Sequence, residues 1–318
     1  MFSVWRNSVS AVQVSAANAL RIAARDNMIL LVASMFLVMV LVSAYLGWSA
    51  TNTVTQIYAK AVPALQALGR PIPPNPVSET PVLSLFRNMV TYVALLGALA
   101  ALVLGYQTVA ADRKAGVLPL ILSRPVKRTS IALGKIAALG ALVALILALG
   151  ALINAATILL LPDVTLTVIV WVGLAEFYLV SFLYMLAFAL LGATCAAYFK
   201  TESMALLVPV TTWLALTFIV PQITANIGPM AALNPVSANL VVPTASFFTY
   251  TSAILGPVSI AESYRFLTSG ILEITSGAGQ TTTSAGALAA LLVIVMIMLV
   301  VFVATFHRFD ACRSEYRD

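Results

Sequence analysis

The chain has 318 residues, of which 61% are hydrophobic and 9% are charged, and its mean hydropathy is +1.02. Because an average soluble domain is about a quarter charged, this composition excludes a soluble protein and indicates an integral membrane protein. The formal charge of +6 comes from residues near the ends of apolar runs, and the single histidine and two cysteines offer neither a metal-binding spacing nor a disulfide framework.

Residues 1–27 are predicted to form an amphipathic elbow helix in the membrane interface. Its apolar side chains recur at steps of three and four, which places them on one helical face. These side chains are Phe2, Trp5, Val9, Val12, Ala16, Ala19 and Ala23. A helix packed on the protein itself is the alternative.

Six later runs are long and apolar enough to cross a bilayer, since a crossing helix needs about 20 apolar residues. They span residues 28–48, 88–111, 132–161, 168–198, 203–221 and 285–306. We therefore predict an all-α fold in which residues 28–318 form one six-span domain. Pro209 and Pro221 predict a kink in or after the fifth run.

The Lys and Arg residues predict the orientation. With both termini in the cytoplasm, the outer set contains only Lys60, Arg70, Arg87 and Arg265. All other Lys and Arg residues then lie inside, as the positive-inside rule requires. The chain is thus expected to be a multi-pass protein of the cell membrane.

Two long outer segments, 49–87 and 222–284, separate the spans on the other side. The first carries a helical pattern between Val54 and Leu68, followed by a proline-rich stretch that cannot be regular helix. In the second, Tyr264, Leu267, Ile271 and Ile274 recur at helical steps. We expect small outer helices that form a partial lid.

Between the second and third runs lies the stretch 112–135, DRKAGVLPLILSRPVKRTSIALGK. Cations flank an apolar patch formed by Val117, Leu118, Leu120, Ile121 and Leu122. A patch on the cytoplasmic side has no lipid to enter, so it indicates a protein partner; a plain basic loop is the alternative. Gly134-Lys135 lacks the upstream glycine of a phosphate-binding loop, so ATP would have to be hydrolysed by another chain.

This stretch resembles the signature of ABC-2 type transporter permeases, E-x-x-x-G-T-L-x-x-L-L-S-x-P-[VI]-x-R followed by G-K. The chain has Asp112, Val117 and Pro119 where the family pattern has Glu, Thr and no proline. The order of six spans, the N-terminal interface helix and the long last outer loop are also similar. The resemblance implies a cytoplasmic coupling helix between spans two and three, seated in a groove of a cytoplasmic ABC ATPase.

The resemblance also implies the coupling residues, which are Asp112, Arg113, Gly116, Leu118, Ile121, Leu122, Ser123, Pro125 and Arg128. Asp112 would favour the dipole of the coupling helix from near its N-terminus. Gly116 would allow a close backbone approach, and Leu118, Ile121 and Leu122 would be buried in the contact. Lys200 and Glu202 form a short inner turn, which either approaches the ATPase or is solvated.

Glu176 is the one carboxylate well inside a predicted span. A charge at mid-bilayer is costly, so it should be paired, protonated or facing a cavity. Three interpretations stay open: a position near the outer end of a long fourth helix, a bond to neighbouring helices, or a place in the translocation path.

The leading hypothesis is a non-catalytic permease subunit of an exporter, which pairs with a second permease copy and with ATPase subunits that bind ATP and Mg²⁺. No cofactor, metal or nucleic acid is expected to bind this chain. Membrane lipid is expected to surround it. The alternative is an ATPase-independent secondary transporter or channel, for which Glu176 is the candidate ion site. An intramembrane enzyme is disfavoured because no His-carboxylate or Ser-His arrangement stands out.

Overall fold

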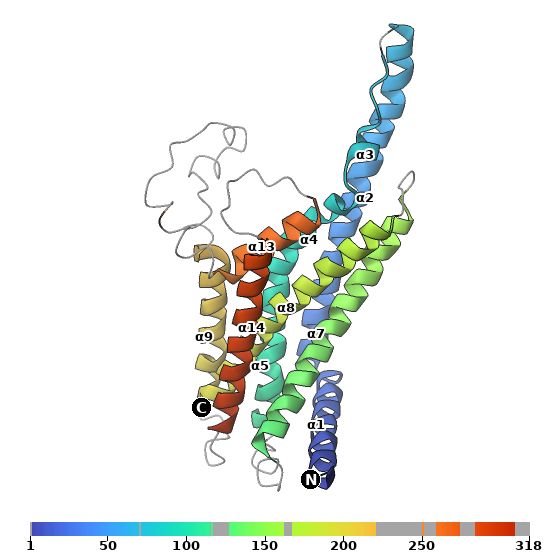
Figure 1. Cartoon of the computed structure of the whole chain (residues 1–318). Helices are drawn as coiled ribbons and strands as arrows, with labels where there is room; N and C mark the ends of the chain where they lie inside the picture. The colour runs from blue at the N-terminus through green and yellow to red at the C-terminus, as the bar shows by residue number, and fades with distance from the viewer. Residues whose placement is uncertain are drawn as a thin grey trace.

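The fold is described from a computed structural model of the chain, shown in Figure 1. The structure describes residues 2–69, 71–114, 116, 127–161, 167–220, 250, 259–273 and 284–308. Within these ranges the regular structure is entirely helical, without strands. Six helices are long and apolar enough to span a membrane, which confirms the predicted all-α membrane fold. They are Asn27–Ala67, Val82–Lys114, Arg128–Leu159, Val168–Tyr198, Glu202–Ile219 and Ser284–His307.

Two of these spans contain more than one helical type. The second combines η1 (Val82–Phe86), α4 (Arg87–Tyr92), the π-helical η2 (Val93–Gly97) and α5 (Ala98–Lys114). The fifth combines α9 (Glu202–Leu214) with the π-helical η3 (Ala215–Ile219). Pro209 lies inside α9 and precedes this π-helical segment, whereas Pro221 falls outside the described residues.

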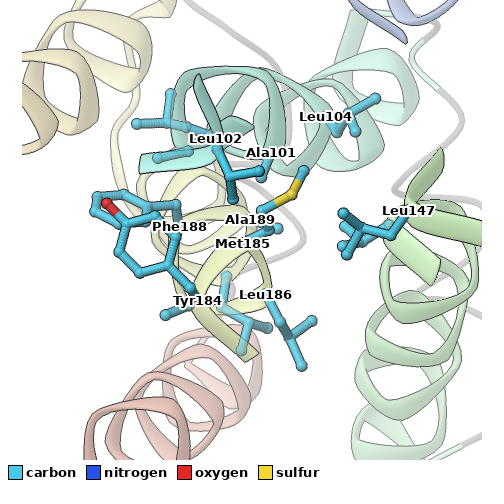
Figure 2. Packing of buried hydrophobic residues seen from close by; sticks show 14 of the residues in the cluster. Ala101, Leu102, Leu104, Leu147, Tyr184, Met185, Leu186, Phe188 and Ala189 are labelled. Carbon is cyan, nitrogen blue, oxygen red and sulfur yellow. The ribbon is translucent and has the colours of Figure 1, made fainter. Parts of the chain in front are cut away.

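The core of the bundle is the crossing of α5 with α8 (Val168–Tyr198). Figure 2 shows side chains of α5 facing Met185 and Ala189 of α8, with Leu147 of α7 (Arg128–Leu159) beside them. The two backbones approach closely at two glycines. A Cβ on Gly105 would lie 1.8 Å from the Ala189 carbonyl oxygen, and one on Gly192 would lie 2.1 Å from that of Leu102. Small residues thus serve packing within the chain here.

The remaining spans surround this core and expose apolar faces. On α7 the side chains of Leu145 and Leu152 are 59% and 66% exposed, and on α14 (Ser284–His307) Val300 is 63% exposed. Exposed leucine and valine on this scale suit a hydrocarbon environment and would be unfavourable in water. The outer surface of the bundle therefore agrees with its membrane character.

The first span is longer than the sequence predicted. We expected a span over 28–48 and a separate helical pattern in the outer segment, but α2 is one continuous helix from Asn27 to Ala67. Its 41 residues correspond to about 60 Å, roughly twice the hydrocarbon thickness. Thr51 and Thr55 bond their hydroxyls back to carbonyls one turn earlier, so polar residues continue the helix where the apolar run ends. Figure 1 shows α2 projecting beyond the other spans.

The chain then returns along α2. Residues 71–75 contain no helix, in keeping with their prolines. The Tyr58 hydroxyl donates a hydrogen bond to the Pro73 carbonyl at 2.8 Å, and Asn75 caps the short helix α3 (Pro76–Glu79). A pocket of about 430 Å³ lies between α2 and this returning segment.

The predicted helix in the last outer segment is α13, which spans Ile260–Ile271; Ile274 lies outside the described residues. Ser259 caps it by accepting a hydrogen bond from the backbone N–H of Glu262. The side chain of Tyr264 is fully buried, stacks on Tyr184 with ring centroids 4.3 Å apart, and shares a 3.0 Å hydrogen bond with Ser181. These contacts fix α13 against α8 at the end of the bundle from which α2 projects (Figure 1).

Candidate functional site

Cations gather at the end of the bundle opposite to α13, which we call the basic end. Arg113 and Lys114 end α5, and Lys127 and Arg128 begin α7. Lys200 lies between α8 and α9, and Arg308 follows α14. The first residues of α1 (Phe2–Ala23) also lie at this end in Figure 1. Both flanks of the connection 115–126 are therefore at the basic end.

Part of the predicted coupling segment can be placed. Asp112, Arg113, Gly116 and Arg128 are described. The other predicted contact residues, which are Leu118, Ile121, Leu122, Ser123 and Pro125, lie outside the described residues. The apolar patch and the coupling helix itself stay predictions.

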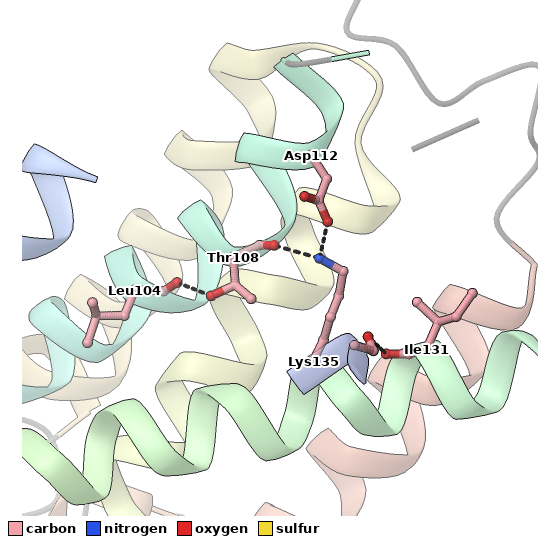
Figure 3. A network of polar contacts seen from close by, with 6 residues as sticks. Leu104, Thr108, Asp112, Ile131 and Lys135 are labelled. Atoms are coloured by element: carbon pink, nitrogen blue, oxygen red, sulfur yellow. Dashed lines mark hydrogen bonds and ion pairs between the residues drawn. The ribbon is translucent and has the colours of Figure 1, made fainter. Parts of the chain in front are cut away.

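Asp112 and Lys135 form a buried ion pair between α5 and α7 (Figure 3). The Lys135 Nζ lies 2.5 Å from Asp112 Oδ2, and the two side chains are 4% and 8% exposed, respectively. Nζ also donates a hydrogen bond to the Thr108 carbonyl at 2.7 Å. The ammonium group thus bonds two successive turns of α5, which sets both the spacing and the rotation of α5 relative to α7.

We expected Asp112 to lie near the N-terminus of the coupling helix, which itself falls outside the described residues. Asp112 lies in the last turn of α5, near a helix C-terminus, where the helix dipole opposes a carboxylate. The adjacent ammonium of Lys135 supplies the compensating charge instead. The sequence carried a signal for this pairing, since Lys135 lies two turns inside an apolar helix and such a charge needs a partner.

Arg113 ties α5 to α8. Its side chain is 3% exposed, and its Nη1 donates hydrogen bonds to the carbonyls of Ala196 at 2.5 Å and Phe199 at 2.7 Å. These carbonyls lie at the C-terminus of α8, where the last turn has no N–H partners within the helix. A guanidinium at this position satisfies them and interacts favourably with the helix dipole.

Gly116 terminates α5. Its φ is +63°, a left-handed conformation that favours glycine, and its N–H donates to the Arg113 carbonyl at 3.1 Å. From the sequence we expected Gly116 to allow a close approach of another backbone. The overlooked signal was a glycine two positions after a basic helical turn, a common pattern at helix ends.

The turn between α8 and α9 also contacts α5. Glu202, in the first turn of α9, forms an ion pair with Lys114, and the two side chains are about half exposed. The Tyr106 hydroxyl donates to Glu202 Oε1 at 3.3 Å. Glu202 is therefore engaged within the chain and is not simply solvated.

The helix α1 packs on the start of α7. A Cβ on Gly134 would lie 2.5 Å from Ser15 Cβ, so the glycine lets α1 approach, and Ser15 Oγ donates to the Ile131 carbonyl at 3.5 Å. The Gly134-Lys135 pair of the sequence signature thus serves two contacts, Gly134 to α1 and Lys135 to α5. Contact of α1 with lipid headgroups stays a prediction.

Arg128 and Glu176 complete the predicted residues. Arg128 Nη1 donates to the His307 carbonyl at 3.2 Å, which joins the start of α7 to the end of α14. Glu176 is exposed and lies about 12 Å along α8 from Val168. Its side chain makes no hydrogen bond or ion pair to the part of the chain that the structure describes. This position agrees with the first interpretation, and a role in the translocation path stays a prediction.

Comparison with protein families gives one match that spans most of the chain. The family model described as ABC-2 family transporter protein matches residues 13–311. A comparison with individually curated proteins gave no match. The matched range includes all six candidate spans and both flanks of the connection 115–126. This multi-pass membrane chain therefore belongs to the ABC-2 transporter family.

Proposed function

We propose that this chain is the membrane-spanning permease subunit of an ATP-driven ABC transporter that works as an exporter. Two permease copies would associate with two cytoplasmic ATPase subunits, which bind ATP and Mg²⁺. Closure of the ATPase pair on ATP would move the segments seated on it, and the spans would then switch access between the two sides of the cell membrane. Family membership supports this assignment.

The observation that carries the proposal is the position of the connection 115–126. Its flanking residues, Lys114 and Lys127, both lie at the basic end, and the connection itself holds the apolar patch that includes Leu118 and Leu122. The positive-inside rule assigns the basic end to the cytoplasm. An apolar patch between two spans would thus be presented to a cytoplasmic protein, with both termini on the same side.

Copurification tests the proposal. The tagged chain is expressed together with candidate ABC ATPases from the same organism, extracted in mild detergent and purified through its tag. We expect an ATPase to remain bound, and we expect Leu118→Asp combined with Leu122→Asp to release it, because a carboxylate in an apolar contact is costly to desolvate.

Leu68→Asp is the matched control. Leu68 follows α2 at the opposite end of the bundle and is 71% exposed. This variant carries the same chemical change and should retain the ATPase. Absence of any ATPase from the purified parent protein, or its retention by the Leu118→Asp, Leu122→Asp variant, would contradict the proposal.

A further inference from the structure

Buried polar contacts anchor both flanks of the connection 115–126. On the N-terminal side of the connection, at the end of α5, Asp112 binds α7 and its neighbour Arg113 binds α8. On the C-terminal side, in α7, Lys135 binds α5 at two points. The three spans α5, α7 and α8 are therefore joined at the same level, immediately behind the connection.

Stability alone gives no reason for such an arrangement. Desolvation of two charges offsets much of their attraction, and apolar residues of similar volume often replace a buried ion pair without loss of stability. An ion pair differs from an apolar contact because it is directional. Lys135 has two acceptors on successive turns of α5, so the helices cannot slide or rotate past one another without breaking a charged hydrogen bond.

The first two helices cover this junction. Ala23 and Asp26 near the α1–α2 corner line a narrow gap together with Thr108 and Asp112. Gly134 receives α1 one residue before Lys135. The ion pair is thus enclosed by the chain itself and does not face a cytoplasmic partner, which assigns it to contacts between spans.

We propose that Asp112, Arg113 and Lys135 are the positioning residues of the coupling step. Movement imposed on the connection 115–126 is transmitted through them to α5, α7 and α8, which move as one unit. This inference rests on the proposed function, since it assumes that an ATPase acts on the connection. These three residues transmit the movement, whereas the apolar patch provides the contact with the ATPase.

The test separates movement from assembly. Leu160, 75% exposed at the far end of α7, is replaced by cysteine for a spin label, after Cys195→Ala and Cys312→Ser. The label is attached in both permease copies of the ATPase complex in lipid nanodiscs. Double electron–electron resonance spectroscopy then measures the distance between the two spin labels, without nucleotide and with ATP plus vanadate. ATP hydrolysis is measured on the same sample.

The parent complex should show an ATP-dependent change in this distance. Lys135→Met should keep the ATPase bound and hydrolysing ATP but lose the change, whereas Lys135→Arg should restore it because the guanidinium can still reach Asp112. Lys114→Met is the matched control: it removes a half-exposed ion pair only two residues beyond Asp112 and should leave the change intact.

A second variant addresses misfolding. If Lys135→Met leaves Asp112 as an unpaired buried charge and fails to assemble, Asp112→Leu combined with Lys135→Met removes both charges. This double variant should assemble, hydrolyse ATP and still lack the distance change. A change equal to the parent's in an assembled complex of either variant would overturn the inference and leave the proposed function standing. A parent chain that binds no ATPase would overturn both.

Discussion

The close crossing of α5 and α8 gives the sharpest prediction of stability. In Gly105→Ala the new Cβ would lie 1.8 Å from the Ala189 carbonyl oxygen, about 1.6 Å short of the 3.4 Å of ordinary contact. The obstacle is backbone, so no side-chain rotation relieves it and the two central helices must separate. Overpacking of a core typically lowers the free energy of unfolding by about 1–3 kcal/mol. Because this variant forces two core backbones apart, we expect a loss of about 3 kcal/mol or more.

The chain supplies a matched control for this variant. A Cβ on Gly140 in α7 meets nothing nearer than Phe182 Cζ, at 3.9 Å. Gly140→Ala should therefore be neutral or stabilise by about 0.5–1 kcal/mol, because alanine favours a helix over glycine. Unfolding of the purified proteins in micelles by SDS titration, followed by tryptophan fluorescence, measures both. Equal stability of the two variants would refute the close crossing.

Three further predictions concern charged groups. Lys135→Met should cost about 3–5 kcal/mol because it leaves the Asp112 carboxylate buried without its partner; the same SDS titration measures this, and an unchanged midpoint would contradict the buried pair. Arg113→Met should speed hydrogen exchange in the last turn of α8 and leave the middle of α8 unchanged, because the Ala196 and Phe199 carbonyls lose their donor; uniform exchange along α8 would argue against a local capping role. Burial raises the pKa of Glu262 from 4.5 to about 7, against the lowering effect of Arg265. The folded protein then binds more protons than the unfolded chain between these values, so the stability of α13 should fall as the pH rises from about 4.5 to 7. Hydrogen exchange of α13 at pH 5 and pH 8, corrected for the intrinsic rate, should show this difference in the parent and not in Glu262→Gln.

The sequence predicted the spans well because their signal is local. Runs of about 20 apolar residues locate each crossing without knowledge of any partner. The length of α2 was missed because hydropathy falls after Trp48, although no residue between Trp48 and Pro63 breaks a helix. Hydropathy reports the environment of a helix, and it does not report where the helix ends.

The basic end was only partly predictable for a different reason. The signature residues Asp112 and Lys135 were both singled out, but they belong to different spans, and their pairing depends on how α5 packs against α7. A basic residue near a span end satisfies the positive-inside rule whether it is solvated or buried. Arg113 illustrates this, since the same charge that indicates orientation also caps α8.

The proposed function requires a separate ATPase to bind the connection 115–126. Its most direct test is photo-crosslinking in intact cell membranes, with a benzophenone side chain placed at Leu122 and, for comparison, at Leu68. We predict that the probe at Leu122 captures a P-loop ATPase and that the probe at Leu68 does not. Capture at Leu122 of lipid or of the chain itself, with no ATPase, would contradict it.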